Sequence, residues 1–399
     1  MNKNINKLYM MGNADSRMIV GLMSGTSLDG LDVALCKISG CGLETHIELL
    51  EFATIPYTAL FKNQVKEVFA KKLASLEKVC LLNEWIGVFH GRLVLDCLKK
   101  WGIRPEAVDL IASHGQTIYH APTWLHQDDR FPNATLQIGD GDHIAVTTGI
   151  ITLSDFRQKH LAAGGEGAPL AVYGDHLIFS KEGENRIMLN IGGIANFTFL
   201  PGNRDVSAIF SSDTGPGNTL MDSYVQQYFN TPFDKDSAIA NSGSLHEGLL
   251  SALTSHSFFQ QPFPKTTGPE LFNLEYLRFA QNESGTVTLN HEDVLRTLNR
   301  FTAVTIAQSI RNCCDPNQTY TLYASGGGMH NPLVMEQLRE MLPAFTFYTT
   351  SDLSIHPDAK EAVLFAILAN ETIAGNQLSY GNAQSGIPSV SMGKISFPD

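Results

Sequence analysis

The chain has 399 residues, of which 43% are hydrophobic and 17% are charged, and its formal net charge at pH 7 is −12. This length predicts two domains, and this composition, with 34 glycines and no low-complexity tract, excludes a disordered or fibrous protein. The negative charge is not offset by any basic run, which argues against a nucleic acid or an anionic membrane as partner. The six cysteines contain no CxxC pair, which favours reduced thiols.

Residues 1–17 contain one apolar stretch, Leu8–Met11, which is too short for a signal peptide. We therefore predict that residues 1–17 form a disordered extension. No later apolar run approaches the roughly 20 residues of a membrane helix. The protein is accordingly expected to be cytoplasmic.

From Met18 the chain predicts a β-hairpin whose second strand is Val33–Ile38 and whose tip is polar. Two glycines in the tip have the spacing of a P-loop, but Leu31 and Asp32 stand where that loop requires Lys and Ser or Thr. The tip is therefore either an ordinary turn or a phosphate site of another kind. Its hydroxyls and backbone amides suit a nucleotide triphosphate, and two of its carboxylates suit a hydrated Mg²⁺. The predicted cofactor-binding residues here are Gly25, Thr26, Ser27, Leu28, Asp29, Gly30, Leu31 and Asp32.

Two further polar clusters follow predicted strands in the first half of the chain. An amphipathic helix is predicted over 75–101, and after it strand Val108–Ala112 leads into SHGQT at 113–117. Strand Ile150–Leu153 leads into SDFR at 154–157. Because ligands gather at the carboxyl ends of strands in α/β sheets, the two clusters together indicate a binding edge.

The second half of the chain repeats the plan of the first. Residues 187–200 again predict strand, glycine turn and strand, and strand Ala208–Ser211 leads into DTGPGN at 213–218. A third strand, Thr319–Ala324, leads into SGGG at 325–328 and then a helix. We predict an N-terminal domain over 18–156, completed by 380–399, and a C-terminal domain over 157–379. The cleft between two such α/β domains is the expected ligand site.

Several candidate residues keep two interpretations on local sequence alone. Glu166 lies in a glycine-rich loop, LAAGGEGAPL at 161–170, that either is simply solvated or lets a ligand approach its backbone. Asp213 precedes a helix, so capping and catalysis are equally favoured. Glu361 falls in the first turn of a helix, where a carboxylate already complements the helix dipole.

Taken in order, eight motifs resemble the anhydro-N-acetylmuramic acid kinase family. They cover the chain from about Met18 to the C-terminus. The motifs are GLMSGTSLDGLDVAL at 21–35, HGQT at 114–117, DFR at 155–157, AGGEGAPL at 163–170, LNIGGIAN at 189–196, DTGPGN at 213–218, KTTG at 265–268 and GGG at 326–328. The resemblance implies the fold of the actin, sugar kinase and Hsp70 superfamily: two duplicated ribonuclease-H-like domains around a central cleft.

The resemblance also implies a reaction and roles for residues. ATP, with Mg²⁺, would phosphorylate O6 of 1,6-anhydro-N-acetylmuramic acid while water opens the anhydro bridge, giving N-acetylmuramic acid 6-phosphate and ADP. Asp213 falls at the position of the family's general base. The tip at Gly25–Asp32 falls at the first phosphate hairpin of the superfamily. The other implied nucleotide residues are Gly192, Gly193, Gly326, Gly327 and Gly328, and the implied sugar residues are Thr117, Asp155, Arg157, Glu166 and Glu361.

The sequence departs from the family pattern near the implied sugar side. The departures are Gln158, Lys159, His160, Glu166, Pro269 and the run 171–176. They leave a levoglucosan-type anhydro sugar kinase as the nearest alternative, and a non-catalytic sugar sensor on the same fold as another. The expected partners are an anhydro sugar and ATP, and the oligomeric state stays open, with a homodimer compatible with the resemblance.

Overall fold

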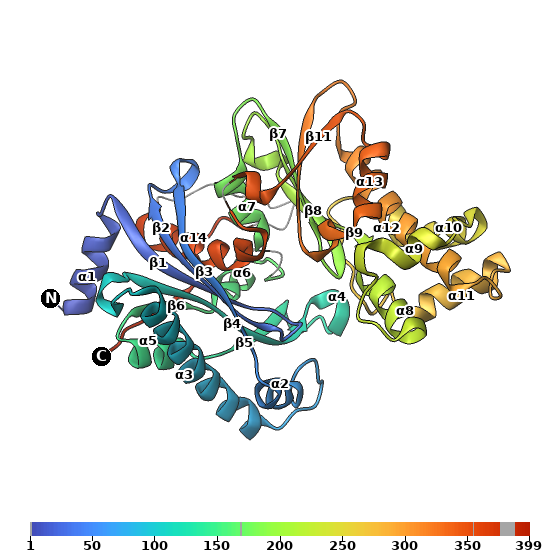
Figure 1. Ribbon diagram of the computed structural model, residues 1–399. Helices are drawn as coiled ribbons and strands as arrows, with labels where there is room; N and C mark the ends of the chain where they lie inside the picture. Colours follow the sequence, from blue (N-terminus) through green and yellow to red (C-terminus); the bar gives the residue numbers. More distant parts are fainter. Residues whose placement is uncertain (1, 168–169, 354, 376–387) are drawn as a thin grey trace. The chain divides into compact units, whose positions relative to one another are not determined.

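A computed structural model describes residues 2–167, 170–353, 355–375 and 388–399 (Figure 1). The chain divides into two compact units, unit 1 with Met1–Ile178 and Ser354–Asp399, and unit 2 with Phe179–Leu353. Each unit contains one mixed β-sheet. Among the described residues, no helix has the length and apolar character needed to cross a membrane.

The sheet of unit 1 has the strand order β12-β6-β4-β1-β2-β3, and β5 pairs with the far end of β4. Strands β1, β2 and β3 form an antiparallel meander, whereas β4 and β6 run parallel to β1. The bounds are β1 (Ser16–Ser24), β2 (Gly30–Ser39), β3 (His46–Pro56), β4 (Leu110–Ala121), β5 (Ala134–Ile138), β6 (Ile151–Ser154) and β12 (Lys394–Ser396).

The sheet of unit 2 has the order β11-β10-β7-β8-β9. Its first three strands are again an antiparallel meander, and its last two again run parallel to the first. The bounds are β7 (Asn185–Ile191), β8 (Ile194–Leu200), β9 (Phe210–Pro216), β10 (Tyr320–Ser325) and β11 (Phe345–Thr349). The two sheets therefore share one five-strand topology, which confirms the predicted duplicated α/β fold.

Helices cover both faces of the sheet in unit 1. The long α3 begins after the N-cap Ser75 and ends at Gly102, which has a φ of 71°. It packs with α5 over one face, while α14 crosses the other and lies so close to β1 that a Cβ on Gly21 would overlap the carbonyl of Ala362. The helices of unit 1 are α1 (Lys3–Gly12), α2 (Ala59–Lys66), α3 (Leu76–Trp101), α4 (Thr123–His126), α5 (Gly141–Thr148), α6 (Phe156–Ala162), α7 (Ala171–Phe179) and α14 (Lys360–Ala374).

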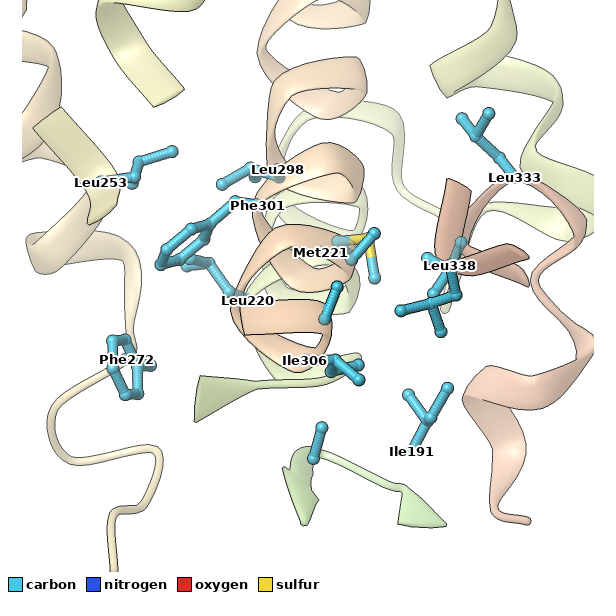
Figure 2. Close-up of a cluster of buried hydrophobic side chains, with 14 of the residues drawn as sticks. Ile191, Leu220, Met221, Leu253, Phe272, Leu298, Phe301, Ile306, Leu333 and Leu338 are labelled. Atoms are coloured by element: carbon cyan, nitrogen blue, oxygen red, sulfur yellow. The ribbon is translucent and has the colours of Figure 1, made fainter. Parts of the chain in front are cut away.

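The core of unit 2 is built around α12, as Figure 2 shows. Leu298, Phe301 and Ile306 on this helix are buried against side chains from α8, α13 and the end of β7. The helices of unit 2 are α8 (Thr219–Phe229), α9 (Ala238–Ser242), α10 (Glu247–Thr254), α11 (Leu274–Ser284), α12 (His291–Cys313) and α13 (Pro332–Met341). Burial of this continuous apolar cluster supplies the main stabilisation of the unit.

The N-terminal segment differs from the predicted disordered extension. Asn2 caps α1 by accepting hydrogen bonds from the amides of Asn4 and Ile5. The guanidinium of the buried Arg17 donates to the carbonyls of Met11 and Ala14. The prediction failed because α1 is fixed by contacts with α14 and β1, which a local pattern does not reveal.

The boundaries of the units also differ from the predicted one near residue 156. Unit 1 continues through α6 and α7, and the chain returns to it at residue 354. Strand β12 pairs antiparallel with β6, so the last described residues belong to unit 1. Residues 380–387 of the segment predicted to complete that domain lie outside the described residues.

Candidate active site

Three predicted motifs of unit 1 lie at one edge of its sheet. Ser24 at the end of β1 pairs with Gln116 on β4, and Ser113 on β4 pairs with Ser154 at the end of β6. The hairpin tip, HGQT and SDFR are therefore neighbours, as strand ends in a parallel arrangement should be. One detail differs from the prediction: β4 does not stop before residues 113–117 but continues through them to pair with β5.

A buried hydrogen-bond network supports the first hairpin tip. The Ser24 hydroxyl donates to Gln116 Oε1 at 2.5 Å, and Gln116 Nε2 donates to the carbonyl of Gly25 at 3.3 Å. Tyr57 lies 2.7 Å from the Ser24 hydroxyl and 3.0 Å from His90 Nε2. Sequence reasoning missed Tyr57 and His90, because no local motif marks them. These hydrogen bonds hold the hairpin tip in place.

The two glycines of this tip have different surroundings. A Cβ on Gly30 would lie 2.5 Å from the carbonyl oxygen of Ile55, so the neighbouring strand requires glycine there. A Cβ on Gly25 would meet nothing nearer than Ser27 Oγ at 3.7 Å. Protein packing therefore explains Gly30, whereas Gly25 leaves room beside its backbone for another molecule.

Carboxylates gather beside the same hairpin. Asp32 accepts a hydrogen bond of 2.5 Å from Thr54 Oγ1. Burial raises the pKa of Asp32 to about 6, the Thr54 bond opposes this rise, and the negative charges of Glu361, Asp358 and Asp29 add to it. A cation at this position would relieve that repulsion, so the oxygen donors fit Mg²⁺. Among the described residues, no group of three or more His, Cys, Asp or Glu side chains is arranged to hold a metal.

Arg157 is the centre of the predicted sugar-binding set in unit 1. Its Nε donates to His114 Nε2 at 2.9 Å, and its NH1 group donates to the carbonyl of Gly167 at 2.7 Å. Burial lowers the pKa of Arg157 to about 10, opposed by the charge of Glu361. Burial and the adjacent guanidinium keep the pKa of His114 well below its usual value, so His114 is neutral and can accept this bond.

The other predicted sugar residues belong to the same unit as Arg157, and the charge of Glu361 acts on Arg157. Thr117 accepts a 3.0 Å hydrogen bond from Gln137 Nε2, a partner that sequence reasoning missed. Asp155, with a φ of 57°, forms an ion pair with Lys394. Burial raises the pKa of Glu361, opposed by the charge of Arg157. A cavity of about 540 Å³ has His114, Gln137, Asp155 and Lys394 in its lining.

Two of the departures from the family pattern have structural roles in unit 1. His160 Nδ1 accepts a 3.0 Å hydrogen bond from the Gly167 amide, and a Cβ on Gly165 would overlap the imidazole. Burial lowers the pKa of His160 to about 4, so the ring is neutral at pH 7. Gln158 Nε2 donates to the carbonyl of Thr135 at 2.8 Å. His160 thus holds the glycine-rich loop that carries Glu166, whose pKa burial raises, while Gln158 is bonded to β5.

In unit 2, Asp213 lies inside strand β9 and does not cap a helix. The helix that follows begins at Thr219, after Asn218. The register of β8 and β9 shifts at Asp213, and such bulges redirect side chains. Asp213 Oδ2 accepts a 2.8 Å hydrogen bond from the Thr267 amide in the KTTG motif. The capping alternative is therefore excluded.

The environment of Asp213 suits a proton acceptor. Burial raises its pKa to about 7, the Thr267 bond lowers it, and the charge of Glu270 raises it. A carboxylate with a pKa near the working pH is both available as a base and strong enough to remove a proton. The KTTG motif was part of the resemblance, but its bond to Asp213 could not be read from the sequence because 54 positions separate Asp213 and Thr267.

The glycine turn between β7 and β8 packs against the beginning of α8. The carbonyl of Gly192 accepts a hydrogen bond from the Asn218 amide, and that of Gly193 accepts one from the Gly217 amide. A Cβ on Gly193 would lie 2.5 Å from Thr219 Oγ1. The second predicted phosphate hairpin and the DTGPGN motif therefore form one local structure.

The triple glycine after β10 adjoins the same end of β7. Gly326 has a φ of 80°, and a Cβ there would lie 2.5 Å from Asn190 Oδ1. A Cβ on Gly328 would overlap the side chain of Ile191, whereas one on Gly327 would meet only Asn218 Nδ2 at 3.8 Å. Packing on β7 thus requires two of these glycines, and only Gly327 leaves open space.

A duplicated α/β fold with a glycine-tipped hairpin in each unit and a carboxylate that can accept a proton fits an ATP-dependent sugar kinase. A model of the anhydro-N-acetylmuramic acid kinase family matches residues 17–396. A protein of Pseudoalteromonas atlantica with that name is 59% identical over 401 residues, covering 100% of both chains. One of Caldanaerobacter subterraneus subsp. tengcongensis is 38% identical over 396 residues, covering 98% of this chain and 100% of its own. The chain belongs to the anhydro-N-acetylmuramic acid kinase family.

Proposed function

We propose that the protein uses ATP to phosphorylate O6 of 1,6-anhydro-N-acetylmuramic acid while water opens the anhydro bridge. The products are N-acetylmuramic acid 6-phosphate and ADP, and the reaction serves the recycling of cell-wall sugars in the cytoplasm. The observation that carries the proposal is the environment of Asp213, a half-buried carboxylate with a pKa of about 7 in a chain of this family.

Asp213 is the proposed general base for the attacking water. As the water oxygen bonds to C1, Asp213 accepts the proton and the bond between C1 and the bridge oxygen breaks. The bridge oxygen remains on C6 as O6, takes the γ-phosphoryl group, and ADP leaves with the electrons of the broken P–O bond. Water is a poor nucleophile at C1, so a base with a pKa near neutrality is the group that this step needs.

The two hairpins and the triple glycine are the proposed nucleotide-binding residues. The hydroxyls of Thr26 and Ser27 and the open space beside Gly25 suit phosphate oxygens. Mg²⁺, when bound, neutralises charge on the phosphates, and Asp29 and Asp32 would hold it through its water ligands. The open face at Gly327 suits the adenosine end of the nucleotide.

Thr117, Asp155, Arg157, Glu166 and Glu361 are the proposed sugar-binding residues. All five belong to unit 1. Arg157 is preorganised, because His114 and the carbonyl of Gly167 already fix its guanidinium plane. An arginine held in this way binds a carboxylate or hydroxyl group with little loss of side-chain entropy.

The test is a coupled measurement of ADP formation and of the fate of the bridge oxygen. We expect ADP formation to require 1,6-anhydro-N-acetylmuramic acid and to be much slower with levoglucosan, which lacks the lactyl and acetamido groups. With ¹⁸O in the bridge, phosphorus NMR should show the label in the phosphate ester. ADP formation that is equally fast without any sugar, or label that stays at C1, would contradict the proposal.

A further inference from the structure

The ammonium group of Lys265 is buried in unit 2 without a carboxylate partner among the ion pairs of the described residues. Lys265 is only 7% exposed, so water cannot solvate its charge fully. Its Nζ donates to the carbonyl of Phe258 at 3.0 Å and to that of Phe259 at 3.4 Å. It also lies over the rings of Phe258, at 4.6 Å from the centroid, and Phe263, at 5.3 Å. Burying a lysine in this way is costly and needs a reason.

The main chain of Lys265 is bonded directly to the strand that carries Asp213. Its carbonyl accepts a 2.9 Å hydrogen bond from the Asp213 amide, and its amide donates to Ser212 Oγ at 3.0 Å. Two residues further on, the Thr267 amide donates to the Asp213 carboxylate. One short segment, 265–267, therefore fixes both the backbone and the side chain of Asp213.

The aromatic cage also supports the bulge in β9. A Cβ on Gly215 would lie 3.1 Å from the ring of Phe259, whose carbonyl accepts from Lys265. Phe258 and Phe259 in turn pack edge-on against Phe272 and Phe301 of the core. The hydrogen bonds of the ammonium group thus anchor segment 265–267 to the core of unit 2, next to the bulge in β9 that follows Asp213.

We propose that Lys265 is a positioning residue for Asp213, acting through the 265–267 backbone that its caged ammonium anchors. The proposal rests on the proposed role of Asp213 as general base. Lys265 acts through the backbone bonds of this segment, and the charged group that shifts the pKa of Asp213 is Glu270.

The test compares Lys265→Met with the parent and with Arg186→Met. Methionine keeps the apolar stem but removes the ammonium, so the 265–267 backbone should loosen and the Thr267 bond to Asp213 should weaken. The Thr267 bond lowers the pKa of Asp213, so its loss should raise that pKa. The acid limb of the pH profile of kcat/KM should then move to higher pH by about one unit. A displaced base should also lower kcat/KM by roughly 10- to 100-fold, with the KM for ATP little changed.

Arg186 is the matched control because it is also a buried cation of unit 2 over an aromatic ring. It is 6% exposed, its guanidinium carbon lies 5.1 Å from the centre of the Tyr323 ring, and it donates to the carbonyl of Phe179. Arg186→Met should lose comparable stability but keep the acid limb of the parent. If Lys265→Met is folded and its acid limb matches the parent, the positioning role is overturned.

A second variant and a second measurement test the proposal even if Lys265→Met does not fold. Ser212→Ala removes the hydroxyl oxygen that accepts a hydrogen bond from the Lys265 amide. The acid limb of the pH profile should move in the same direction by a smaller amount. If Lys265→Met does not fold, an unshifted limb in Ser212→Ala overturns the proposal. Carbon NMR titration of the Asp213 carboxyl, assigned with Asp213→Asn, reports the same shift in the ligand-free protein. A parent without sugar-dependent ADP formation would refute the proposed function, while this titration would still decide the role of Lys265.

Discussion

The two glycine-tipped hairpins occupy the same place in their sheets but differ in what surrounds their tips. In unit 2 the carbonyls of Gly192 and Gly193 are bonded to the amides that begin α8, and packing leaves no room for a Cβ on Gly193. In unit 1 the tip is supported from below by Gln116, and the space beside Gly25 is open. Packing therefore accounts for Gly193 in unit 2, as it does for Gly30 in unit 1, whereas Gly25 leaves room beside its backbone for a ligand.

The half-buried carboxylates Asp32 and Asp213 also differ in their surroundings. Asp32 in unit 1 has a pKa of about 6 and is surrounded by three further acids, which favours a cation. Asp213 in unit 2 has a pKa of about 7, with Glu270 as the acid that raises it further. Burial raises both pKa values, and the two sites differ in the number of neighbouring negative charges.

The largest expected effect comes from removing the base of unit 2. Asp213→Asn keeps the shape of the side chain but cannot accept a proton, so ADP formation should fall by about 10²- to 10⁴-fold. ATP affinity measured by calorimetry should stay near that of the parent. Asp32→Asn should show the opposite pattern, with weaker Mg·ATP binding as its main defect. Near-parent turnover by a folded Asp213→Asn protein would remove Asp213 from the mechanism.

The same substitution should change how stability depends on pH. Because the pKa of Asp213 is raised on folding, the folded state binds more protons than the unfolded state between about pH 4 and 7, and stability falls as pH rises through that window. Asp213→Asn should flatten this fall, which thermal melts at several pH values would detect. A fall of the same size in the variant would show that other groups cause it.

The sequence predicted most of the framework because the relevant signals are local. Strand and glycine-turn patterns located both hairpins, and apolar residues spaced by three or four over 75–101 located α3. The return of the chain to unit 1 was predicted at residue 380, but its position at residue 354 could not be predicted, because it depends on packing between segments far apart in sequence. The bond from Thr267 to Asp213 escaped prediction for the same reason, although both motifs had been recognised.

Alanine substitutions at Gly25, in the first hairpin tip, and at Gly217, which packs against the second, would test how the two tips differ. A Cβ on Gly217 would overlap the carbonyl of Gly192, so Gly217→Ala should lower the free energy of unfolding by about 1–3 kcal/mol. Gly25→Ala meets no neighbour and should change it by less than about 0.5 kcal/mol. Its methyl group would occupy the open space, so ATP affinity should fall instead. Urea unfolding would measure the change in stability, and calorimetry the change in ATP affinity. Equal destabilisation by the two substitutions would show that packing requires both glycines alike.

A smaller effect is expected from the acid beside Asp213. Glu270→Gln removes a negative charge that raises the pKa of Asp213, so that pKa should fall. The acid limb of kcat/KM should move to lower pH by less than about one unit, because Glu270 is exposed and water screens its charge. Glu275→Gln, an exposed acid of α11, is the control and should leave the limb in place. A shift toward higher pH would mean that Glu270 acts through structure and not through charge.

The smallest expected effect concerns the hydroxyl beside Asp32. Thr54→Val keeps the size of the side chain but removes the hydrogen bond that lowers the pKa of Asp32, so that pKa should rise above about 6. More of the group is then protonated near pH 6.5, and Mg·ATP should bind about two- to fivefold more weakly there, the scale of one neutral hydrogen bond. At pH 8.5 Asp32 is ionised in both proteins, so their affinities should agree.

Thr45→Val is the control, because it removes a hydroxyl that donates to Glu371 away from the hairpin. It should bind Mg·ATP as the parent does at both pH values. A loss of affinity in Thr54→Val that is the same at pH 6.5 and 8.5 would show that Thr54 shapes the hairpin and does not tune the charge of Asp32.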